Sequence, residues 1–241
     1  SLISPLRARI LGSQPGLRML EAFTADVETL RVDTPHGKLE AKVSIPLGER
    51  VTAIVLLIHG MSSQSEIVFE WSFLMEELRR RKIAAVLPNL HSCDQTAPAT
   101  GDVTKALSAL EAIADWMQQC TGPAPLFVYG KSWGGARSME LCRRLHDQGR
   151  SPAGMVLACP AMPEGDVLDG LRLPAVLAWA EDDDVIPFTE HEALLQDLRR
   201  QDPRTVFVPV QAGGHRIDKM AELDERLATK LSEWPDLVLG P

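Results

Sequence analysis

The alternation of apolar and polar side chains near the start of the chain predicts strands with one buried face. Residues 27–32 and 39–45 each alternate apolar and polar positions with a period of two, as half-buried strands do. A Pro-His-Gly turn at residues 35–37 joins them, so we expect an antiparallel hairpin. Residues 53–58 are instead apolar throughout, which is typical of a central strand covered on both faces.

From residue 60 onward, strand and helix patterns follow one another. Short apolar runs predict further strands at residues 83–87, 126–129, 155–158, 175–180 and 205–210. Helical spacing of apolar positions predicts helices at residues 67–81, from 101 onward with Asp102 as the N-cap, and at 133–146, 190–200 and 217–234. An antiparallel pair followed by repeated strand–helix units predicts an α/β fold, with one mostly parallel sheet and helices on both faces. We expect a single domain over residues 27–241, preceded by an arm at residues 1–26.

Composition and charge say more about the binding partners of this protein than about its fold. The chain of 241 residues is 45% hydrophobic and 24% charged, which is ordinary for a globular protein of one domain. Its 33 acidic and 25 basic residues give a net charge of −8, which argues against nucleic acid or an anionic membrane as a partner. No apolar run approaches the roughly 18 to 20 residues of a membrane-spanning helix. We expect a small-molecule substrate, and the oligomeric state stays open.

The four cysteines predict neither disulfides nor a metal site. Cys93, Cys120, Cys142 and Cys159 form no C-x-x-C pair and lack the spacing of metal ligands. Reduced, inert thiols fit a reducing compartment, so we expect a cytoplasmic protein without a metal or another cofactor. Arginines at positions 7, 9 and 18 precede the first acid, at position 21, and leave an organellar targeting segment as an alternative.

The stretch from residue 126 to residue 135 carries the main chemical signal. A short apolar run ends in a G-x-S-x-G sequence at residues 130–134, and a helical pattern begins directly after it. A serine on such a strand-to-helix turn forms a nucleophile elbow, which lifts the Ser132 hydroxyl clear of the sheet. The glycines on both sides remove the Cβ atoms that would collide where strand and helix pack closely. We therefore predict that Ser132 is a catalytic nucleophile.

Two later loops carry the other groups that a serine nucleophile needs. Ligands of a parallel sheet bind beyond the carboxyl ends of its strands, so catalytic groups are expected in loops that follow strands. Residues 181–184 are four consecutive acids, any of which offers an acceptor for a histidine N–H, and residues 211–215 end in Gly-Gly-His215. Taken alone, a solvated acidic loop and a turn histidine are the alternatives. The chain order of serine, acid and histidine favours a triad.

Acyl transfer also requires N–H donors for the oxyanion, and two are well placed. One is the amide of Trp133, at the start of the helix that follows the nucleophile. The other is the amide of Met61, just past the central strand, in a loop that we expect His59 to hold.

Two further residues are candidate substrate contacts. His91 lies in the long loop 88–101, and Lys131 directly precedes the nucleophile. The alternatives are a plain loop residue for His91 and an ion pair with a nearby carboxylate for Lys131.

At these residues the chain resembles the α/β-hydrolase superfamily over residues 27–234, and most of all its small lidless members, such as dienelactone-hydrolase-like proteins. The matching segments are His59-Gly60, residues 130–135, residues 183–187 and Gly214-His215. The resemblance implies a Ser132–His215–Asp183 triad, because the acid of this superfamily commonly stands four residues before a proline, here Pro187. It also implies that the amides of Met61 and Trp133 bind the oxyanion.

The function expected from these residues is that of a serine hydrolase with an open site. Only residues 160–173 separate two predicted strands at the place where this superfamily usually inserts a lid, which is too short for a cap domain. A small ester, a thioester or an acylated surface group suits such a site. The alternatives are a non-catalytic α/β-hydrolase scaffold that binds a small molecule or a protein, and an acyltransferase or deacylase.

Overall fold

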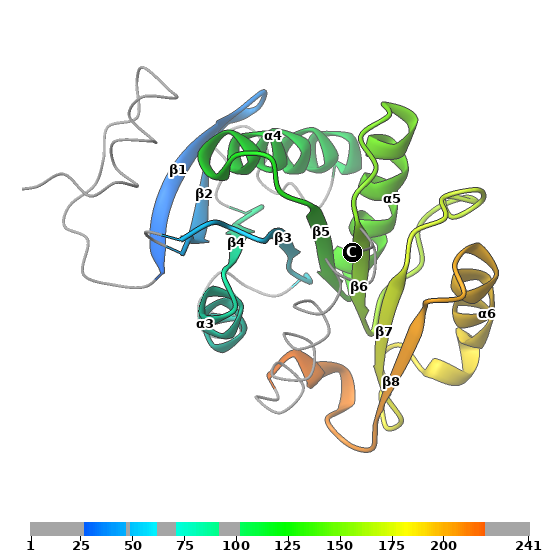
Figure 1. The fold of residues 1–241 in the computed structure, drawn as a ribbon. Coiled ribbons are helices and arrows are strands. Elements are labelled where there is room, and N and C mark those ends of the chain that lie inside the picture. Colours follow the sequence, from blue (N-terminus) through cyan, green and yellow to red (C-terminus); the bar gives the residue numbers. More distant parts are fainter. Residues whose placement is uncertain (1–26, 47–48, 62–70, 92–101, 220–241) are drawn as a thin grey trace, which may run out of the picture.

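The parallel strands of this protein bring the ends of distant segments to one edge of a single sheet. The computed structural model describes residues 27–46, 49–61, 71–91 and 102–219. Within these ranges eight strands form one sheet in the order β1-β2-β4-β3-β5-β6-β7-β8 (Figure 1). Strands β1 (Glu28–Thr34) and β2 (Gly37–Ser44) are the predicted antiparallel hairpin, and β2 also runs antiparallel to β4 (Ile83–Pro88).

The other neighbours in the sheet are all parallel, as the repeated strand–helix units predict. These strands are β3 (Ala53–Ile58), β5 (Leu126–Lys131), β6 (Gly154–Ala158), β7 (Ala175–Ala180) and β8 (Val206–Val210), with β4 between β2 and β3. Every residue of β3 to β7 is buried, whereas burial alternates along β1. The difference follows from the apolar patterns, because a strand with apolar residues at every position is stable only when both of its faces are covered.

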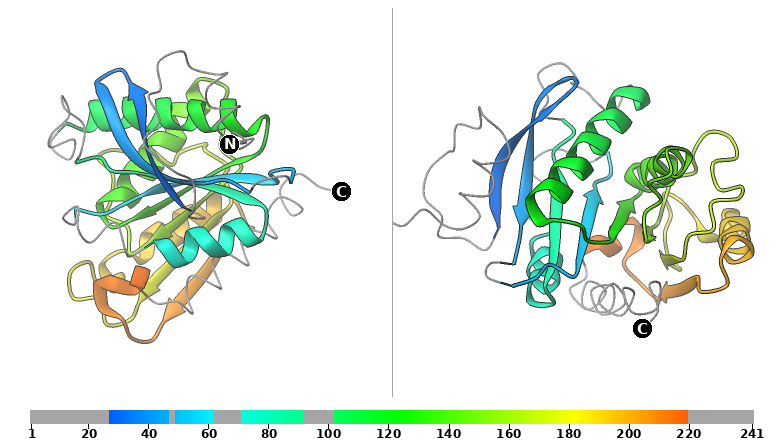
Figure 2. Two further views of the ribbon diagram at one scale, coloured as in Figure 1. Left: turned by 90° about the vertical axis from the view of Figure 1, so that its left-hand side faces the viewer. Right: turned by 45° about the horizontal axis from the view of Figure 1, so that its top comes forward.

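Helices cover both faces of the sheet. Helices α4 (Val103–Thr121) and α5 (Trp133–Asp147) lie on one face and α3 (Ser72–Arg80) on the opposite one (Figures 1 and 2). The predicted N-cap of α4 is confirmed, since the Asp102 carboxylate accepts a hydrogen bond from the Lys105 amide. Helix α6 (Glu192–Gln201) lies beside β7 and β8. Among the described residues, none of the helices combines the length and the apolar character that crossing a bilayer requires.

Several predicted elements differ from the structure or fall partly outside the described residues. The helix predicted at residues 190–200 is preceded by a separate 3-10 turn, η2 (Phe188–Glu190). Residues 217–219 belong to another 3-10 segment, η3 (Gly214–Lys219), and the rest of the helix predicted at 217–234 lies outside the described residues. The first part of the helix predicted at 67–81 and the arm predicted at 1–26 also lie outside them.

The sheet has one edge at which loops from six strands meet. Because β3 to β8 run in the same direction, the segments that follow each of them emerge at the same edge. The segment between β6 and β7, residues 159–174, contains neither a helix nor a strand. This segment therefore carries no cap domain, as predicted.

Candidate active site

Ser132 occupies the sharp turn between β5 and α5. Its backbone has φ +53° and ψ −124°, a conformation that costs a non-glycine residue on the order of 1 to 3 kcal/mol. Hydrogen bonds hold the turn in this shape: the Ser132 N–H donates to the Ala158 carbonyl at 3.0 Å, and the Ser132 carbonyl accepts from Gly135 and Ala161 at 2.8 Å each. The backbone around the hydroxyl is thus fixed by neighbours on α5 and on the segment after β6.

The glycines on both sides of Ser132 allow α5 to pack directly on the sheet. A Cβ at Gly134 would overlap the carbonyl oxygens of Ile58 and His59 at the end of β3. A Cβ at Gly130 would overlap the Gly134 carbonyl in the first turn of the helix. The G-x-S-x-G sequence is therefore required here by close backbone approach, as we inferred from the sequence alone.

The structure brings the three residues predicted as a triad into one hydrogen-bonded chain. The Nε2 atom of His215 lies 2.8 Å from the Ser132 hydroxyl oxygen, and its Nδ1 atom lies 2.9 Å from a carboxylate oxygen of Asp183. An ionised carboxylate can only accept, so the Nδ1 atom carries a hydrogen and its N–H donates a hydrogen bond to Asp183. The Nε2 atom is then free to accept the hydroxyl hydrogen of Ser132, which is the arrangement of a general base.

Hydrogen bonds keep the Asp183 carboxylate ionised although its side chain is fully buried. One of its oxygens accepts from the amides of Val185 at 3.0 Å and Ile186 at 2.9 Å. Burial on its own raises the pKa of this group. The hydrogen bonds from the Ile186 amide, the His215 imidazole and the Cys159 thiol outweigh it, and they leave the pKa of Asp183 below its ordinary value.

The neighbouring acids have different positions. The Asp182 carboxylate accepts hydrogen bonds from the backbone amides of Gly213 at 3.2 Å and Gly214 at 2.8 Å. Asp182 and Asp184 are both exposed to solvent, whereas Asp183 is buried. Of the acids that the sequence left open, Asp183 is the one whose side chain contacts the imidazole of His215.

The two amides predicted to bind the oxyanion come from segments beside Ser132. Trp133 is the first residue of α5, where backbone N–H groups have no acceptor within the helix. Gly60 lies against the nucleophile, since a Cβ on it would be 3.3 Å from the Cβ of Ser132, and Met61 follows directly. The donor roles of the Met61 and Trp133 amides stay predictions.

His59 ties the segments after β3 and β4 together, as expected from the sequence. Its Nδ1 atom donates to the Gly60 carbonyl at 2.6 Å, and its Nε2 atom accepts from the Leu90 amide at 3.1 Å. Burial lowers the pKa of this imidazole to about 4, so it is neutral at physiological pH. Both ring nitrogens are engaged, which fits a structural role rather than that of a base.

The two candidate substrate contacts differ in exposure. The His91 ring packs against His59, with ring centroids 5.1 Å apart, and is half-buried. The Lys131 residue is only 3% exposed, and its aliphatic chain lies against Gly60, so it offers little surface to a substrate. Both assignments stay predictions.

Cys159 is a neighbour of the triad that the sequence analysis missed. It follows β6, its backbone has φ +40°, and its thiol bonds to Asp183. We treated it as an inert thiol, although its place directly after a strand next to β7 was a signal for proximity. The sulfur, carboxylate and imidazole of Cys159, Asp183 and His215 lie within 4.8 Å of one another, as metal ligands can. Burial raises the pKa of the thiol, however, which disfavours the thiolate that a metal needs.

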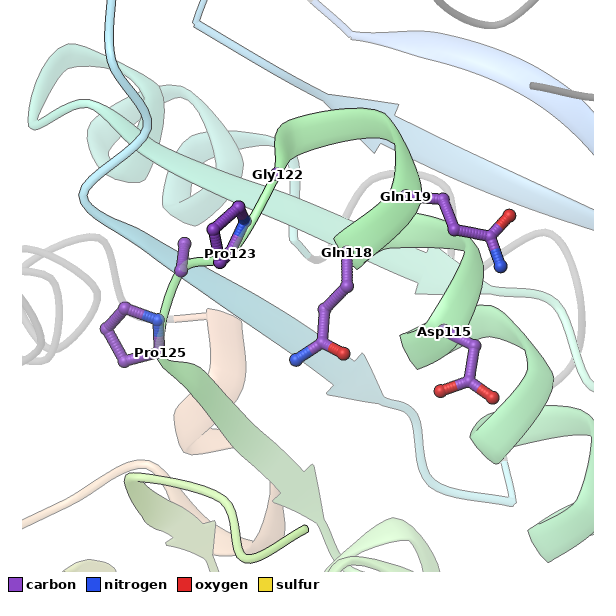
Figure 3. A pocket seen from close by; sticks show the side chains of 7 residues that line it. Asp115, Gln118, Gln119, Gly122, Pro123 and Pro125 are labelled. Carbon is purple, nitrogen blue, oxygen red and sulfur yellow. The ribbon is translucent and has the colours of Figure 1, made fainter.

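A separate depression lies at the opposite edge of the sheet. The residues that line it belong to the end of α4 and the segment leading into β5: Asp115, Gln118, Gln119, Gly122, Pro123, Ala124 and Pro125 (Figure 3). Pro125 directly precedes β5, whereas Ser132 directly follows it, so the strand separates this depression from the triad. It is therefore distinct from the candidate active site.

Comparisons with known proteins agree with the fold. Residues 55–239 match the family described as the alpha/beta hydrolase family. No curated protein matches the sequence.

Several solved structures share the fold at low sequence identity. A serine hydrolase without a lid from Xanthomonas campestris has a TM-score of 0.69 at 18% identity, covering 89% of this chain and 98% of that one. Dienelactone hydrolase from Anabaena variabilis has a TM-score of 0.67 at 19% identity, covering 87% and 97%. Est1E from Butyrivibrio proteoclasticus has a TM-score of 0.69 at 15% identity, covering 86% and 98%.

Proposed function

Because this chain belongs to the α/β-hydrolase family, we propose that it is a serine hydrolase that cleaves a small ester or thioester through an acyl-enzyme on Ser132. The family supports hydrolysis as the reaction. The observation that carries the finer proposal is the unbroken hydrogen-bonded chain from Ser132 through His215 to Asp183.

The first half of the proposed reaction forms the acyl-enzyme. The Ser132 oxygen attacks the carbonyl carbon of the substrate while His215 Nε2 takes the hydroxyl proton. The imidazolium that forms is stabilised by the Asp183 carboxylate, which stays ionised because its pKa is lowered. The amides of Met61 and Trp133 would stabilise the negative charge on the substrate oxygen, and removal of one such donor commonly costs about 3 to 4 kcal/mol. As the tetrahedral intermediate collapses, His215 returns the proton to the alcohol or thiol that leaves.

The second half releases the acid. His215 removes a proton from a water molecule, the resulting nucleophile attacks the acyl carbonyl, and the proton passes to the Ser132 oxygen as the acyl–oxygen bond breaks. The same residues thus act twice, and the products are a carboxylic acid and an alcohol or thiol.

Among the described residues, the surroundings of Ser132 support a small substrate with an apolar acyl group. The segment between β6 and β7 carries no cap, and two apolar side chains near the nucleophile are exposed, Met61 at 60% and Met162 at 47%. Met61 follows Gly60, which lies against Ser132, and Met162 follows Ala161, whose amide bonds to the Ser132 carbonyl. An apolar acyl group of modest length fits these surroundings, because it covers exposed apolar surface next to the reacting carbonyl.

A fluorophosphonate probe and a panel of p-nitrophenyl esters graded by acyl length test this proposal. We expect covalent labelling at Ser132 and ester hydrolysis by the wild-type protein, and neither by Ser132→Ala. Ser108→Ala is the matched control, because Ser108 lies on α4 and its hydroxyl bonds only within that helix. A folded wild-type protein that is neither labelled nor active would overturn the proposal and favour a non-catalytic scaffold. Turnover that depends on an added alcohol or amine acceptor would instead indicate an acyltransferase.

A further inference from the structure

The segment that carries His215 has an intrinsically flexible backbone sequence. It follows β8 and contains Gly213 with φ +143° and Gly214 with φ +54°, immediately before the histidine. Two consecutive glycines give a chain more backbone freedom than any other pair, so nothing in the local sequence fixes where the imidazole points. A catalytic base needs the reverse, because its nitrogen must stay within hydrogen-bonding distance of the hydroxyl.

The Asp182 carboxylate restrains this segment from the turn that follows the neighbouring strand, β7. The last backbone bond between β7 and β8 is donated by Glu181 to Val210 at 2.8 Å. One residue further, one Asp182 oxygen accepts from the Gly214 amide at 2.8 Å and the other accepts from the Gly213 amide at 3.2 Å. Because a single carboxylate receives two consecutive N–H groups, it fixes the two peptide units on either side of the Gly213 Cα, and with them the backbone conformation of Gly213.

We propose that Asp182 is a positioning residue for the general base: its carboxylate holds the Gly213–Gly214 backbone in the conformation that keeps His215 within reach of Ser132. This inference rests on the proposed function, because it assigns Asp182 a part in the same reaction. The two adjacent acids then have separate tasks, with Asp183 bonded to the imidazole of His215 and Asp182 to the backbone that precedes it.

The bonds to Asp182 suit a carboxylate that is ionised whenever the enzyme works. Hydrogen bonds from the Gly214 amide, and then from the Gly213 amide, hold the pKa of Asp182 below its ordinary value. An amide side chain in its place keeps only one acceptor oxygen, so Asp182→Asn retains one of the two contacts at most.

The experiment compares Asp182→Ala and Asp182→Asn with Asp184→Ala, which removes the same charge from the exposed acid on the other side of Asp183. For each protein we would measure kcat and KM for a short p-nitrophenyl ester across pH, the rate of fluorophosphonate labelling and Tm. A misplaced base commonly lowers rates by about 10- to 100-fold. We expect a loss of that size in kcat and in labelling rate for Asp182→Ala, with KM within about twofold, and a smaller loss for Asp182→Asn.

The pH profile separates positioning from charge. Both alanine variants delete one negative charge near the imidazole, so any shift of the pH midpoint should be similar in the two. Only Asp182→Ala should lower the plateau of activity. If Asp182→Ala and Asp184→Ala share the same plateau, the positioning role is wrong even though the wild-type enzyme is active. If Asp182→Ala does not fold, the isosteric Asp182→Asn carries the same comparison. A wild-type protein that is neither labelled nor active would instead contradict the function itself.

Discussion

The thiol of Cys159 is hydrogen-bonded to the carboxylate of Asp183 from the end of the neighbouring strand. This contact lowers the pKa of Asp183, together with the bonds from Ile186 and His215 that oppose the effect of burial. Asp183 accepts from Val185 and Ile186 on one oxygen and from His215 on the other. The thiol therefore completes the set of donors around a buried charge, which is expensive to leave partly unsatisfied.

Replacement of Cys159 should change activity through Asp183. We expect Cys159→Ala to lower kcat/KM by about tenfold, in line with roughly 1.5 kcal/mol for a hydrogen bond to a charged group. Cys159→Ser keeps a donor of similar size and should stay within about threefold of wild type. Ester hydrolysis by the purified variants measures both effects. Equal losses in the two variants would show that packing, rather than the hydrogen bond, matters at this position.

His59 should make the stability of the fold depend on pH. Burial lowers the folded-state pKa of its imidazole from an ordinary value of 6.5 to about 4. The hydrogen bond to the Gly60 carbonyl opposes this shift, and the neighbouring His91 adds to it. The neutral imidazole therefore contributes stability that is fully present above pH 6.5 and is lost as the pH falls towards 4. The size of this loss is about 3 kcal/mol.

Chemical denaturation at a series of pH values measures this dependence. The free energy of unfolding of the wild-type protein should fall between pH 6.5 and pH 4. His59→Gln keeps an acceptor for the Leu90 amide but cannot titrate, so most of the slope in this window should disappear. A slope that persists unchanged in the variant would show that other groups cause it.

The backbone conformation of Ser132 should lower the stability of the fold. Its φ of +53° is strained for serine and relaxed for glycine, so we expect Ser132→Gly to be inactive but more stable than Ser132→Ala. The difference in unfolding free energy should be about 1 kcal/mol or more. Differential scanning calorimetry of the two variants tests this, because both lack the hydroxyl and differ only by the methyl group that disfavours a positive φ. A higher Tm for the alanine variant would contradict the strain.

Gly134 should tolerate no side chain. A methyl group there overlaps the carbonyl oxygens of Ile58 and His59, so Gly134→Ala must shift α5 away from β3 and move the nucleophile with it. We expect a loss of stability of several kcal/mol and of fluorophosphonate labelling. Gly165→Ala is the matched control: its φ is +75° but no atom lies near its Cβ position, so it should cost only about 1 kcal/mol and leave labelling intact. Gly134 itself has an ordinary helical φ, so similar effects in both variants would contradict the close approach to β3 as the cause.

The sequence by itself determined the strands, the elbow and two of the candidate catalytic residues, Ser132 and His215, whereas the choice of Asp183 among the neighbouring acids rested on the family resemblance. Burial imposes a visible pattern, so continuous apolar runs located β3 to β7 and alternating residues located β1 and β2. Close packing of α5 on the sheet is likewise visible in the sequence as Gly130 and Gly134, because only glycine fits where two backbone segments lie this close.

Only the tertiary structure decided the roles of the loop residues that follow the strands. Asp182 and Asp183 are adjacent acids with the same intrinsic chemistry, yet one bonds to the backbone of the histidine segment and the other to the imidazole itself. The role of the Cys159 thiol likewise depends on how the ends of β6 and β7 lie side by side. Such contacts join residues far apart in the chain, and their geometry depends on loop conformation and on the register of neighbouring strands. Loop conformation and strand register produce no periodic pattern of apolar residues in the sequence. The position of a loop side chain depends on its tertiary contacts, whereas that of a helix or strand side chain follows from the regular backbone.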